Sequence, residues 1–328
     1  MKLAIIGSYG HVNVVTEGLG QCPDVELVAL ARWGPEDSLA AIGKAVPQTL
    51  PVYDDCRVML DKHRPEVAAV FMPLYRLAEA SLEAAGRGCH VISEKPLATS
   101  LEDLSRLRQA AERAGVRLCA LMTARGEGAF AAIRQAVRDG RIGRCISATA
   151  QKSYPFGTRD DFYRSRSTYG GTIPWQVIHA IDYIHFCTGL DYVRVAATAS
   201  NAAHPSHAGM EDQGGLLAEL TGGGSAIINF DYLRPWGAAG RKWGDDRLRI
   251  AGSGGIIETK DCATAVELLT PQASELLPPL RRRNVFVNFV RALVGAQEPL
   301  ISPAESFRMT EVALKARQAQ DSGQWVRI

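Results

Sequence analysis

Val91-Ile92-Ser93-Glu94-Lys95-Pro96-Leu97 is the stretch on which our interpretation of this chain depends. Its apolar start gives way at once to an acid, a lysine and a proline. Because proline lacks an N–H and fixes its own φ, a strand of a parallel sheet must end before it. Lys95 then lies at the carboxyl end of a strand, where open α/β sheets bind ligands. A surface turn with an exposed Glu94–Lys95 pair is the alternative from these residues alone.

Length and composition limit what this stretch can belong to. The chain has 328 residues, 46% hydrophobic and 22% charged, which favours two globular domains. A net charge of +2 gives no indication of a nucleic acid or an anionic membrane as partner. Seven cysteines occur without a C-x-x-C pair, so we expect neither a zinc site nor a disulfide framework. With no signal-peptide pattern and no long apolar run, we expect a cytoplasmic protein.

The N-terminal part alternates apolar runs with amphipathic segments, as βαβ units do. We predict strands at residues 3–6, 25–31, 52–53, 67–71, 91–92 and 117–121, and helices at about 12–20, 35–43, 55–62, 75–85 and 101–114. Ser100 followed by Asp103 is a weak capping box, and Gly115 is a matching helix stop. Residues 1–122 are therefore predicted to be an α/β domain, a Rossmann-type doubly wound parallel sheet that binds a dinucleotide.

The pattern changes after residue 122. A helix at about 129–139 is followed by a strand at 145–151, a polar and aromatic loop at 152–171 and a helix at about 175–188. Strands separated by turn residues then continue to about residue 269, and two helices and a short strand close the chain. We therefore predict that residues 123–328 form an α+β domain for substrate binding and oligomerisation, with a large, mostly antiparallel sheet packed on helices.

The turn after the first strand, Gly7-Ser8-Tyr9-Gly10-His11, lies where a dinucleotide fingerprint belongs. The strict G-x-G-x-x-G is absent, but Gly7 supplies the tight turn and Gly10 permits a close approach of pyrophosphate. A turn without a ligand is the alternative. Arg32 and Trp33 follow the second predicted strand, where an acid suits NAD and an arginine suits the 2′-phosphate of NADP. We therefore predict a preference for NADP(H) over NAD(H), with Arg32 on the phosphate and Trp33 or Arg32 on adenine.

Taken in order, the motifs resemble those of the glucose–fructose oxidoreductase / inositol dehydrogenase (Gfo/Idh/MocA) family. They are the strand that ends in Glu94-Lys95-Pro96, Ala120-Leu121-Met122-Thr123-Ala124-Arg125, the turn Gly140-Arg141-Ile142-Gly143, the Gly170-Gly171 to His179-Ala180-Ile181-Asp182 helix, and the closing Gly323-Gln324-Trp325-Val326. The resemblance spans nearly the whole chain. It implies an NAD(P)-dependent dehydrogenase or reductase acting on CH–OH groups.

The resemblance assigns roles residue by residue. Lys95 matches a lysine that contacts the nicotinamide ribose and the substrate, and the Lys95–Pro96 bond is expected to be cis. His179 matches the histidine that exchanges a proton with the substrate hydroxyl. Combined with the residues argued above from the strand ends, the cofactor-binding prediction comprises Gly7, Tyr9, Gly10, His11, Arg32, Trp33, Pro73, Tyr75, Glu94, Lys95 and Arg125. With residues chosen from the polar loop at 152–171, the substrate-binding prediction comprises Lys95, Lys152, Tyr163, Arg164, Trp175 and His179.

One departure from the family pattern concerns the chemistry. Relatives commonly carry an aspartate four residues before the histidine, one helical turn away, and here that residue is Trp175. Tryptophan accepts no proton, so it stacks on a sugar or fills the pocket. Either Lys95 and His179 suffice without the acid, or another acid substitutes, or the chemistry differs. Asp182 could serve from the same helix face, although we favour a structural role for it between helix and sheet. The loop cations and Arg125 would suit a carboxylate or phosphate on the substrate, with a solvated loop as the alternative.

The sequence therefore favours hydride transfer between a nicotinamide and a secondary alcohol or ketone of a sugar, polyol or sugar acid. Two alternatives stay open: a nicotinamide-dependent glycosidase or lyase that oxidises its sugar transiently, and a non-catalytic dinucleotide-binding regulator. The broad second sheet and the family habit predict a homodimer or homotetramer. Nothing in the sequence indicates a nucleic acid, a membrane or a metal as partner.

Overall fold

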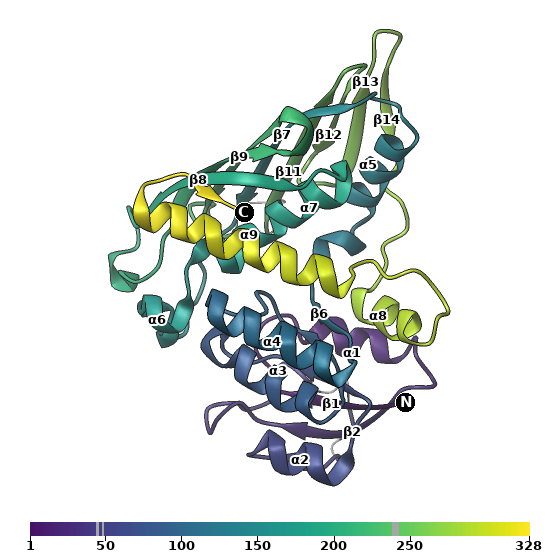
Figure 1. Cartoon of the computed structure of the whole chain (residues 1–328), viewed down its shortest axis with the longest axis vertical. Helices are drawn as coiled ribbons and strands as arrows, with labels where there is room; N and C mark the ends of the chain where they lie inside the picture. The colour runs from purple at the N-terminus through teal and green to yellow at the C-terminus, as the bar shows by residue number, and fades with distance from the viewer. Residues whose placement is uncertain (44–45, 48, 238–242) are drawn as a thin grey trace. The chain divides into compact units, whose positions relative to one another are not determined.

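The computed structural model describes residues 1–43, 46–47, 49–237 and 243–328 (Figure 1). Its contacts divide the chain into two units. Unit 1 comprises Met1–Met122 with Arg283–Thr310, and unit 2 comprises Thr123–Arg282 with Glu311–Ile328. The first crossing coincides with the predicted boundary at residue 122. The return of Arg283–Thr310 to unit 1 differs from the prediction, which gave everything after residue 122 to the second domain.

Unit 1 contains a six-stranded sheet in the order β3-β2-β1-β4-β5-β6, with every pair parallel. The strands are β1 (Lys2–Ile6), β2 (Glu26–Ala31), β3 (Val52–Tyr53), β4 (Val67–Val70), β5 (His90–Ser93) and β6 (Leu118–Ala120). This confirms the predicted doubly wound fold. The chain order reverses between β1 and β4, so their carboxyl ends form the switch point at which such sheets bind ligands.

The helices of unit 1 are α1 (Asn13–Leu19), α2 (Cys56–His63), α3 (Leu77–Gly86) and α4 (Leu101–Ala114). Ser100 caps α4 by accepting the Asp103 N–H at 3.0 Å, and Gly115 ends it at φ +64°, as predicted. The helix predicted at residues 35–43 is wrong, because this stretch forms turns. The Asp37 carboxylate accepts the backbone N–H groups of Trp33 and Leu39, which competes with helical hydrogen bonding.

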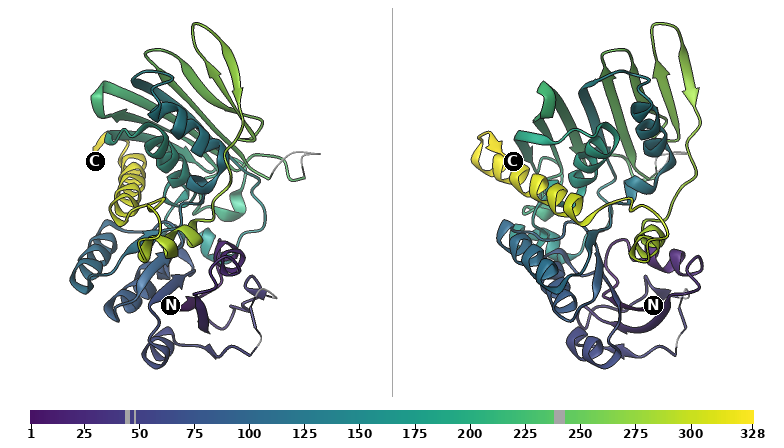
Figure 2. Two further views of the ribbon diagram at one scale, coloured as in Figure 1. Left: turned by 90° about the vertical axis from the view of Figure 1, so that its right-hand side faces the viewer. Right: turned by 45° about the vertical axis from the view of Figure 1, so that its right-hand side comes forward.

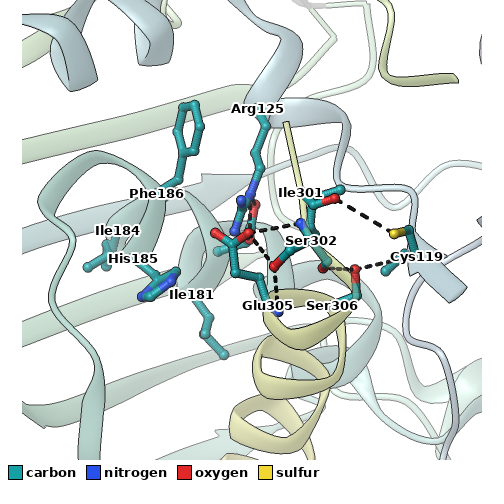
Figure 3. A network of polar contacts seen from close by, with 12 residues as sticks. Cys119, Arg125, Ile181, Ile184, His185, Phe186, Ile301, Ser302, Glu305 and Ser306 are labelled. Atoms are coloured by element: carbon teal, nitrogen blue, oxygen red, sulfur yellow. Dashed lines mark hydrogen bonds and ion pairs between the residues drawn. The ribbon is translucent and has the colours of Figure 1, made fainter. Parts of the chain in front are cut away.

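The segment that returns to unit 1 contributes α8 (Val285–Leu293) and the start of α9 (Pro303–Ser322). At the start of α9, Ser302 and Glu305 form a capping box (Figure 3): the Ser302 N–H donates to Glu305 Oε2 at 2.9 Å, and the Glu305 N–H donates to Ser302 Oγ at 3.1 Å. Ser306 Oγ then accepts the Ala120 N–H at 3.1 Å. These contacts hold the end of β6, which shows why the segment belongs to unit 1.

Unit 2 contains a nine-stranded sheet in the order β14-β13-β12-β11-β7-β10-β9-β8-β15. All pairs are antiparallel except β7 with β10, which confirms the mostly antiparallel sheet. The strands are β7 (Cys145–Ser153), β8 (Tyr192–Ser200), β9 (Gln213–Leu220), β10 (Gly224–Asp231), β11 (Asp245–Gly252), β12 (Ile256–Lys260), β13 (Ala265–Leu269), β14 (Ser274–Leu277) and β15 (Val326–Arg327). The β14 strand was not predicted.

Two helices, α5 (Gly128–Arg138) and α7 (Ile178–Thr188), lie on one face of the large sheet (Figure 2). Side chains alternate along β7: Ala148, Ala150 and Lys152 are buried on the face beneath these helices, whereas Thr149 is exposed on the other. A π-helical turn, η5 (Ile173–Val177), precedes α7. The predicted helix at 175–188 therefore begins with irregular spacing, which matters for the residues before His179.

Two further observations bear on the class of protein. Within the described ranges, none of the helices combines the length and apolarity that crossing a bilayer requires. All seven cysteines are free, and five of them are buried.

Candidate active site

In unit 1 the turn after β1 is tied to the ends of three other strands. The Gly7 N–H donates to Ala31 O at the end of β2 (2.7 Å), and the Tyr9 N–H donates to Phe71 O just after β4 (2.9 Å). The His11 N–H donates to Glu94 Oε2, just after β5, at 2.7 Å. The chain's predicted glycine turn and its Glu-Lys-Pro stretch are therefore brought together at the switch point of the sheet.

The Glu94 carboxylate is the centre of this arrangement. It is completely buried, and Oε2 accepts from both the backbone N–H and Nδ1 of His11, each at 2.7 Å. Because a carboxylate only accepts, His11 must carry its proton on Nδ1. Burial by itself raises the pKa of Glu94, but the positive charges of His11 and Lys95, with these hydrogen bonds, outweigh it and lower the pKa to about 2. Glu94 is therefore a permanent anion at neutral pH.

Lys95 is held against that anion. Its backbone N–H donates to Glu94 Oε1 at 2.8 Å, and its Nζ lies 3.8 Å from the same oxygen. The side chain is 2% exposed. The Lys95–Pro96 peptide bond is cis, which confirms the expectation from the resemblance. The alternative of an exposed surface turn is wrong, because both Glu94 and Lys95 are buried.

The glycines of the turn satisfy the geometric demands of a dinucleotide site. Gly7 has φ +77°, and a Cβ there would collide with Phe71 O. Gly10 has φ +73° and is exposed at the rim, and a Cβ there would collide with the Glu94 carboxylate. Only glycine fits both positions, and glycine has no side chain to cover the backbone. A phosphate can therefore approach this backbone closely, beside the buried Glu94 and Lys95. These residues therefore fit a dinucleotide.

The end of β2 supplies the predicted adenosine side of the site. Arg32 and Trp33 are partly exposed, and Arg32 Nη1 forms an ion pair with Asp54 Oδ1 at 3.0 Å. A pocket of about 160 Å³ is lined by Arg32, Asp54 and Arg76 among others. The Arg32 guanidinium is therefore in the predicted place, but a carboxylate already faces it. The buried Asp37 holds the following loop by accepting from Ser8 Oγ and the Trp33 N–H.

Two further residues from the cofactor prediction lie at the end of β4. Pro73 is buried and caps the 3-10 turn η2 (Leu74–Arg76). Tyr75 is 44% exposed on that turn, so a stacking partner can reach its ring.

In unit 2, His179 lies near the start of α7 and is 7% exposed. Asp182, one turn further along α7, is completely buried and forms a bidentate pair with Arg125 of η3 (Thr123–Gly126), at 2.7 to 3.0 Å. Arg125 is also completely buried. This pair joins η3 to α7, so Asp182 is committed to Arg125. The geometry supports a structural role for Arg125 and gives no support to its predicted contact with cofactor or anionic substrate.

The other predicted substrate residues lie in different surroundings. Trp175 is buried, with 8% of its surface exposed. Tyr163 is 2% exposed and stacks on Phe162 and Tyr169, with ring centroids 4.5 and 4.7 Å away. Arg164 is exposed and bonds locally, with Asp161 Oδ1 at 2.9 Å. Tyr163 is thus packed in an aromatic cluster, and Arg164 lies at the surface, so their contacts give no support to the predicted substrate roles.

Lys152 is the substrate prediction that the structure changes most. The sequence predicts a loop from residue 152, but β7 extends to Ser153, so Lys152 lies in the strand on the helix-covered face. Its Nζ lies 2.7 Å from Asp246 Oδ1 of β11 and 3.2 Å from Tyr154 Oη. The Tyr154 hydroxyl in turn donates to Asp246 Oδ2 at 2.9 Å. Lys152, Asp246 and Tyr154 therefore form a polar cluster in which each side chain contacts the other two.

Comparison with known proteins identifies the group to which these two units belong. Residues 1–121 match the model of the oxidoreductase family with an NAD-binding Rossmann fold, and residues 130–258 match that of the GFO/IDH/MocA C-terminal domain. The chain belongs to the Gfo/Idh/MocA oxidoreductase family. The predicted resemblance and the predicted fold are thereby confirmed.

Relatives within the Gfo/Idh/MocA family act on several cyclic compounds, to judge by their names. A 1,5-anhydro-D-fructose reductase from Ensifer adhaerens is 32% identical over 170 residues, which is 48% of this chain and 50% of that enzyme. An inositol 2-dehydrogenase from Rhizobium meliloti is 25% identical over 91% of this chain and 89% of that enzyme. A solved structure from Thermotoga maritima, assigned as an oxidoreductase, matches all of both chains with 34% identity and a TM-score of 0.94.

Three polar residues at or near these sites were not predicted from the sequence. Asp37 had a signal, because Pro35-Glu36-Asp37-Ser38 is a turn sequence whose aspartate can bond to the backbone. Asp246 had none, since its contact with Lys152 depends on the register between strands 94 residues apart. Gln176 is 5% exposed beside the position where Gfo/Idh/MocA relatives carry an acid, and only its burial distinguishes it. Among the described residues, no group of His, Cys, Asp and Glu is arranged to hold a metal ion.

Proposed function

We propose that the protein is an NAD(P)-dependent dehydrogenase or reductase that interconverts a secondary alcohol and a ketone on a sugar, polyol or sugar acid, with Lys95 and His179 as its catalytic residues. The observation that carries the proposal is the buried Glu94–Lys95 pair beside the glycine turn. The named relatives support the substrate class, because anhydrofructose and inositol are both cyclic polyhydroxyl compounds.

The proposed roles follow from the chemistry of the two side chains. A bound nicotinamide would supply a two-electron acceptor or donor of hydride. Lys95 would donate hydrogen bonds to the substrate oxygen and stabilise negative charge that develops there, while Glu94 fixes its position. His179 would take the hydroxyl proton in oxidation and return it in reduction.

The cofactor preference is a separate part of the proposal. We propose NADP(H) over NAD(H), with Arg32 pairing with the 2′-phosphate after leaving Asp54. Gly7, Gly10 and the backbone around Tyr9 and His11 would hold the pyrophosphate. Titrating the purified protein with NADPH and with NADH tests this directly, and tighter binding of NADH would contradict it.

The catalytic assignment is tested by following the nicotinamide absorbance over a panel of sugars, inositols and anhydro-sugars. Replacing Lys95 with methionine keeps its length and removes its charge, so we expect kcat/KM to fall about 100-fold or more while NADPH still binds. Lys62, an exposed lysine of α2, replaced by methionine is the matched control and should leave the rate unchanged. Equal rates for the Lys95 variant and the wild type would contradict the role of Lys95.

The same assay separates the two other reactions. Consumption of a glycoside without accumulation of reduced cofactor would indicate transient oxidation followed by elimination. Tight cofactor binding without turnover of any carbohydrate would indicate a regulator.

We also propose that the protein forms a homodimer or homotetramer. On the sheet face opposite α5 and α7, Leu217 and Ile227 are each about half exposed, and the register of β9 and β10 places them directly opposite one another. Apolar side chains grouped on an uncovered sheet favour association. Sedimentation analysis would test this, and a monomer at micromolar concentration would contradict it.

A further inference from the structure

The cluster formed by Lys152, Tyr154 and Asp246 is more than a strand-to-strand ion pair. Register pairs Asp246 directly with Lys152 across β11 and β7, and both side chains lie on the helix-covered face of the large sheet. Lys152 is 4% exposed, whereas the Asp246 side chain keeps 21% of its surface accessible. A molecule at that face can therefore reach the carboxylate of Asp246 and, through it, the charge of Lys152.

The position of α7 places this cluster close to His179 within unit 2. The Tyr183 hydroxyl lies 3.0 Å from Gln151 O and 3.1 Å from Arg247 O, the neighbours of Lys152 and Asp246 in their strands. Residues four apart in an α-helix lie one above the other on the same face. His179 therefore lies one turn before Tyr183, on the face of α7 that meets the strands of the cluster.

The charges of the cluster are balanced. Burial by itself lowers the pKa of Lys152, but the charge of Asp246 outweighs it, so the pKa is raised and the ammonium group persists. Burial raises the pKa of Tyr154 to about 12, which keeps its hydroxyl protonated. One cation and one anion 2.7 Å apart leave no net charge to attract an ionic group. They do offer adjacent donors and acceptors of hydrogen bonds.

The other cations predicted to receive an anionic substrate are also engaged. Arg125 pairs with Asp182 and Arg164 with Asp161. The Arg159 guanidinium lies over aromatic rings, 4.4 Å from the centroid of Tyr232. The expectation of a carboxylate or phosphate subsite built from these side chains is therefore not supported by their contacts.

Gln176 independently indicates a site for an uncharged, hydrogen-bonding ligand. It is 5% exposed, and among the described residues neither its amide nitrogen nor its amide oxygen has a hydrogen-bond partner. Burying an amide without hydrogen-bond partners costs free energy, so such a group is normally satisfied by a ligand or another partner. It lies three residues before His179, at the π-helical turn. An uncharged hydroxyl can satisfy both atoms, because it donates and accepts, whereas a carboxylate only accepts.

We propose that Asp246, Lys152, Tyr154 and Gln176 form a subsite for the hydroxyl groups of an uncharged polyol, so that the substrate is a neutral sugar or cyclitol and not a sugar acid or sugar phosphate. The inference rests on the proposed oxidoreductase function and narrows its substrate class. A hydroxyl would donate to Asp246, whose charge Lys152 balances, while Gln176 binds a further hydroxyl.

Binding provides a test that does not require turnover. The protein with NADP⁺ or NADPH is titrated with myo-inositol and D-glucose as neutral probes and with D-glucuronate as the anionic probe, by calorimetry or ligand-observed NMR. We expect the neutral probes to bind about tenfold more tightly than glucuronate, because the subsite offers no unbalanced cation. Replacing Asp246 with asparagine leaves Lys152 uncompensated and should reverse this preference. The Gln176→Leu variant should weaken neutral probes about tenfold.

Asp245 supplies the matched control. It precedes Asp246 in β11 and also forms an ion pair, with Arg247 Nη2 at 2.6 Å, but it lies on the other face of the sheet. The Asp245→Asn variant should keep the wild-type preference. Thermal unfolding of all variants identifies any that fail to fold, in which case Lys152→Met, which should lose the neutral probes, replaces Asp246→Asn.

The outcomes separate this inference from the proposed function. Tighter binding of glucuronate by the wild type, or equal effects of the Asp245 and Asp246 variants, would overturn the subsite even if sugars are oxidised. Selective binding of neutral probes without any turnover would support the subsite and contradict the oxidoreductase proposal. Turnover assays with the same probes provide a second measurement, in which we expect kcat/KM to be higher for the neutral compounds than for glucuronate.

Discussion

Replacing Glu94 with glutamine removes a buried charge without changing the shape of the side chain. The carboxylate accepts from the His11 N–H, from His11 Nδ1 and from the Lys95 N–H, and it lies 3.8 Å from Lys95 Nζ. Its pKa falls from an ordinary value of 4.5 to about 2. The difference is about 2.5 units, which at about 1.4 kcal/mol per unit makes the ionised form worth about 3 to 4 kcal/mol to the folded state at neutral pH.

The sign of the pH dependence follows from the lowered pKa. A carboxyl group whose pKa is depressed by folding contributes its full stabilisation above the unfolded value, 4.5, and loses it as the pH falls towards about 2. The Glu94→Gln variant should therefore be less stable than the wild type by about 3 to 4 kcal/mol at pH 7, and by only about 1 to 2 kcal/mol at pH 3.

Hydrogen exchange measured by mass spectrometry is the appropriate assay, because two units can unfold in separate steps and blur a global transition. Peptides that span β5 report unit 1 alone, and about 3 to 4 kcal/mol corresponds to roughly 300-fold faster exchange after correction for intrinsic rates. The matched control is Glu66→Gln. Glu66 also accepts a backbone N–H, that of Lys2 at 2.7 Å, but its side chain is 61% exposed. Its loss should cost less than about 1 kcal/mol.

A difference between the Glu94 variant and the wild type that is the same at pH 7 and pH 3 would refute this reasoning. It would show that the variant loses packing or hydrogen bonds and not the charge. An effect of the Glu66 variant as large as that of the Glu94 variant would refute it as well, since burial would then not be the cause.

Three further changes have defined outcomes. Gly10→Ala should abolish measurable NADPH binding and destabilise unit 1 by more than the control Gly115→Ala, which costs about 1 kcal/mol. Both glycines have positive φ, but only at Gly10 would a Cβ collide with another side chain. Fluorescence titration and thermal unfolding would measure these effects, and equal binding and stability of the two variants would contradict the prediction. Arg32→Ala should weaken NADPH binding about tenfold and leave NADH binding unchanged, whereas equal losses for both cofactors would remove Arg32 from phosphate recognition. Asp182→Asn should destabilise unit 2 by about 3 kcal/mol by leaving the buried Arg125 unpaired, and the double variant Asp182→Leu/Arg125→Met should recover much of that loss in urea unfolding.

The parallel sheet of unit 1 was predictable strand by strand because strands buried on both faces appear as short, continuous apolar runs. The failure at residues 35–43 has a local cause. Asp37 draws the N–H groups of Trp33 and Leu39 to its side chain, and a period-based argument does not include that competition. The return of Arg283–Thr310 to unit 1 was not predictable, because it depends on contacts such as that between Asn284 and Val14 O, 270 residues apart.

The candidate site likewise has residues that the sequence predicts and contacts that it does not. The positions of Gly7, Gly10 and Glu94 followed from where strands end, which the sequence shows. Their partners did not, since His11 and Glu94 are 83 residues apart and meet only because β1 and β5 flank β4 in one sheet. Asp246 depends in addition on strand register, which no pattern along β7 or β11 specifies on its own.

The structure changes how the absence of an acid at position 175, occupied by Trp175, should be interpreted. The expectation rested on four residues making one turn, which holds for an α-helix. Residues Ile173–Val177 are π-helical, and the Ile178 N–H reaches back to Ile173 O, so spacing along this stretch does not follow the α-helical period. π-helical turns of this kind occur often at functional sites. Gln176 is buried there without partners among the described residues, so it is the polar side chain that stands nearest before His179. Under the proposed subsite, this neutral amide and the balanced Lys152–Asp246 pair would both bind hydroxyl groups. The missing acid would then change how the substrate is bound and not whether the enzyme is active.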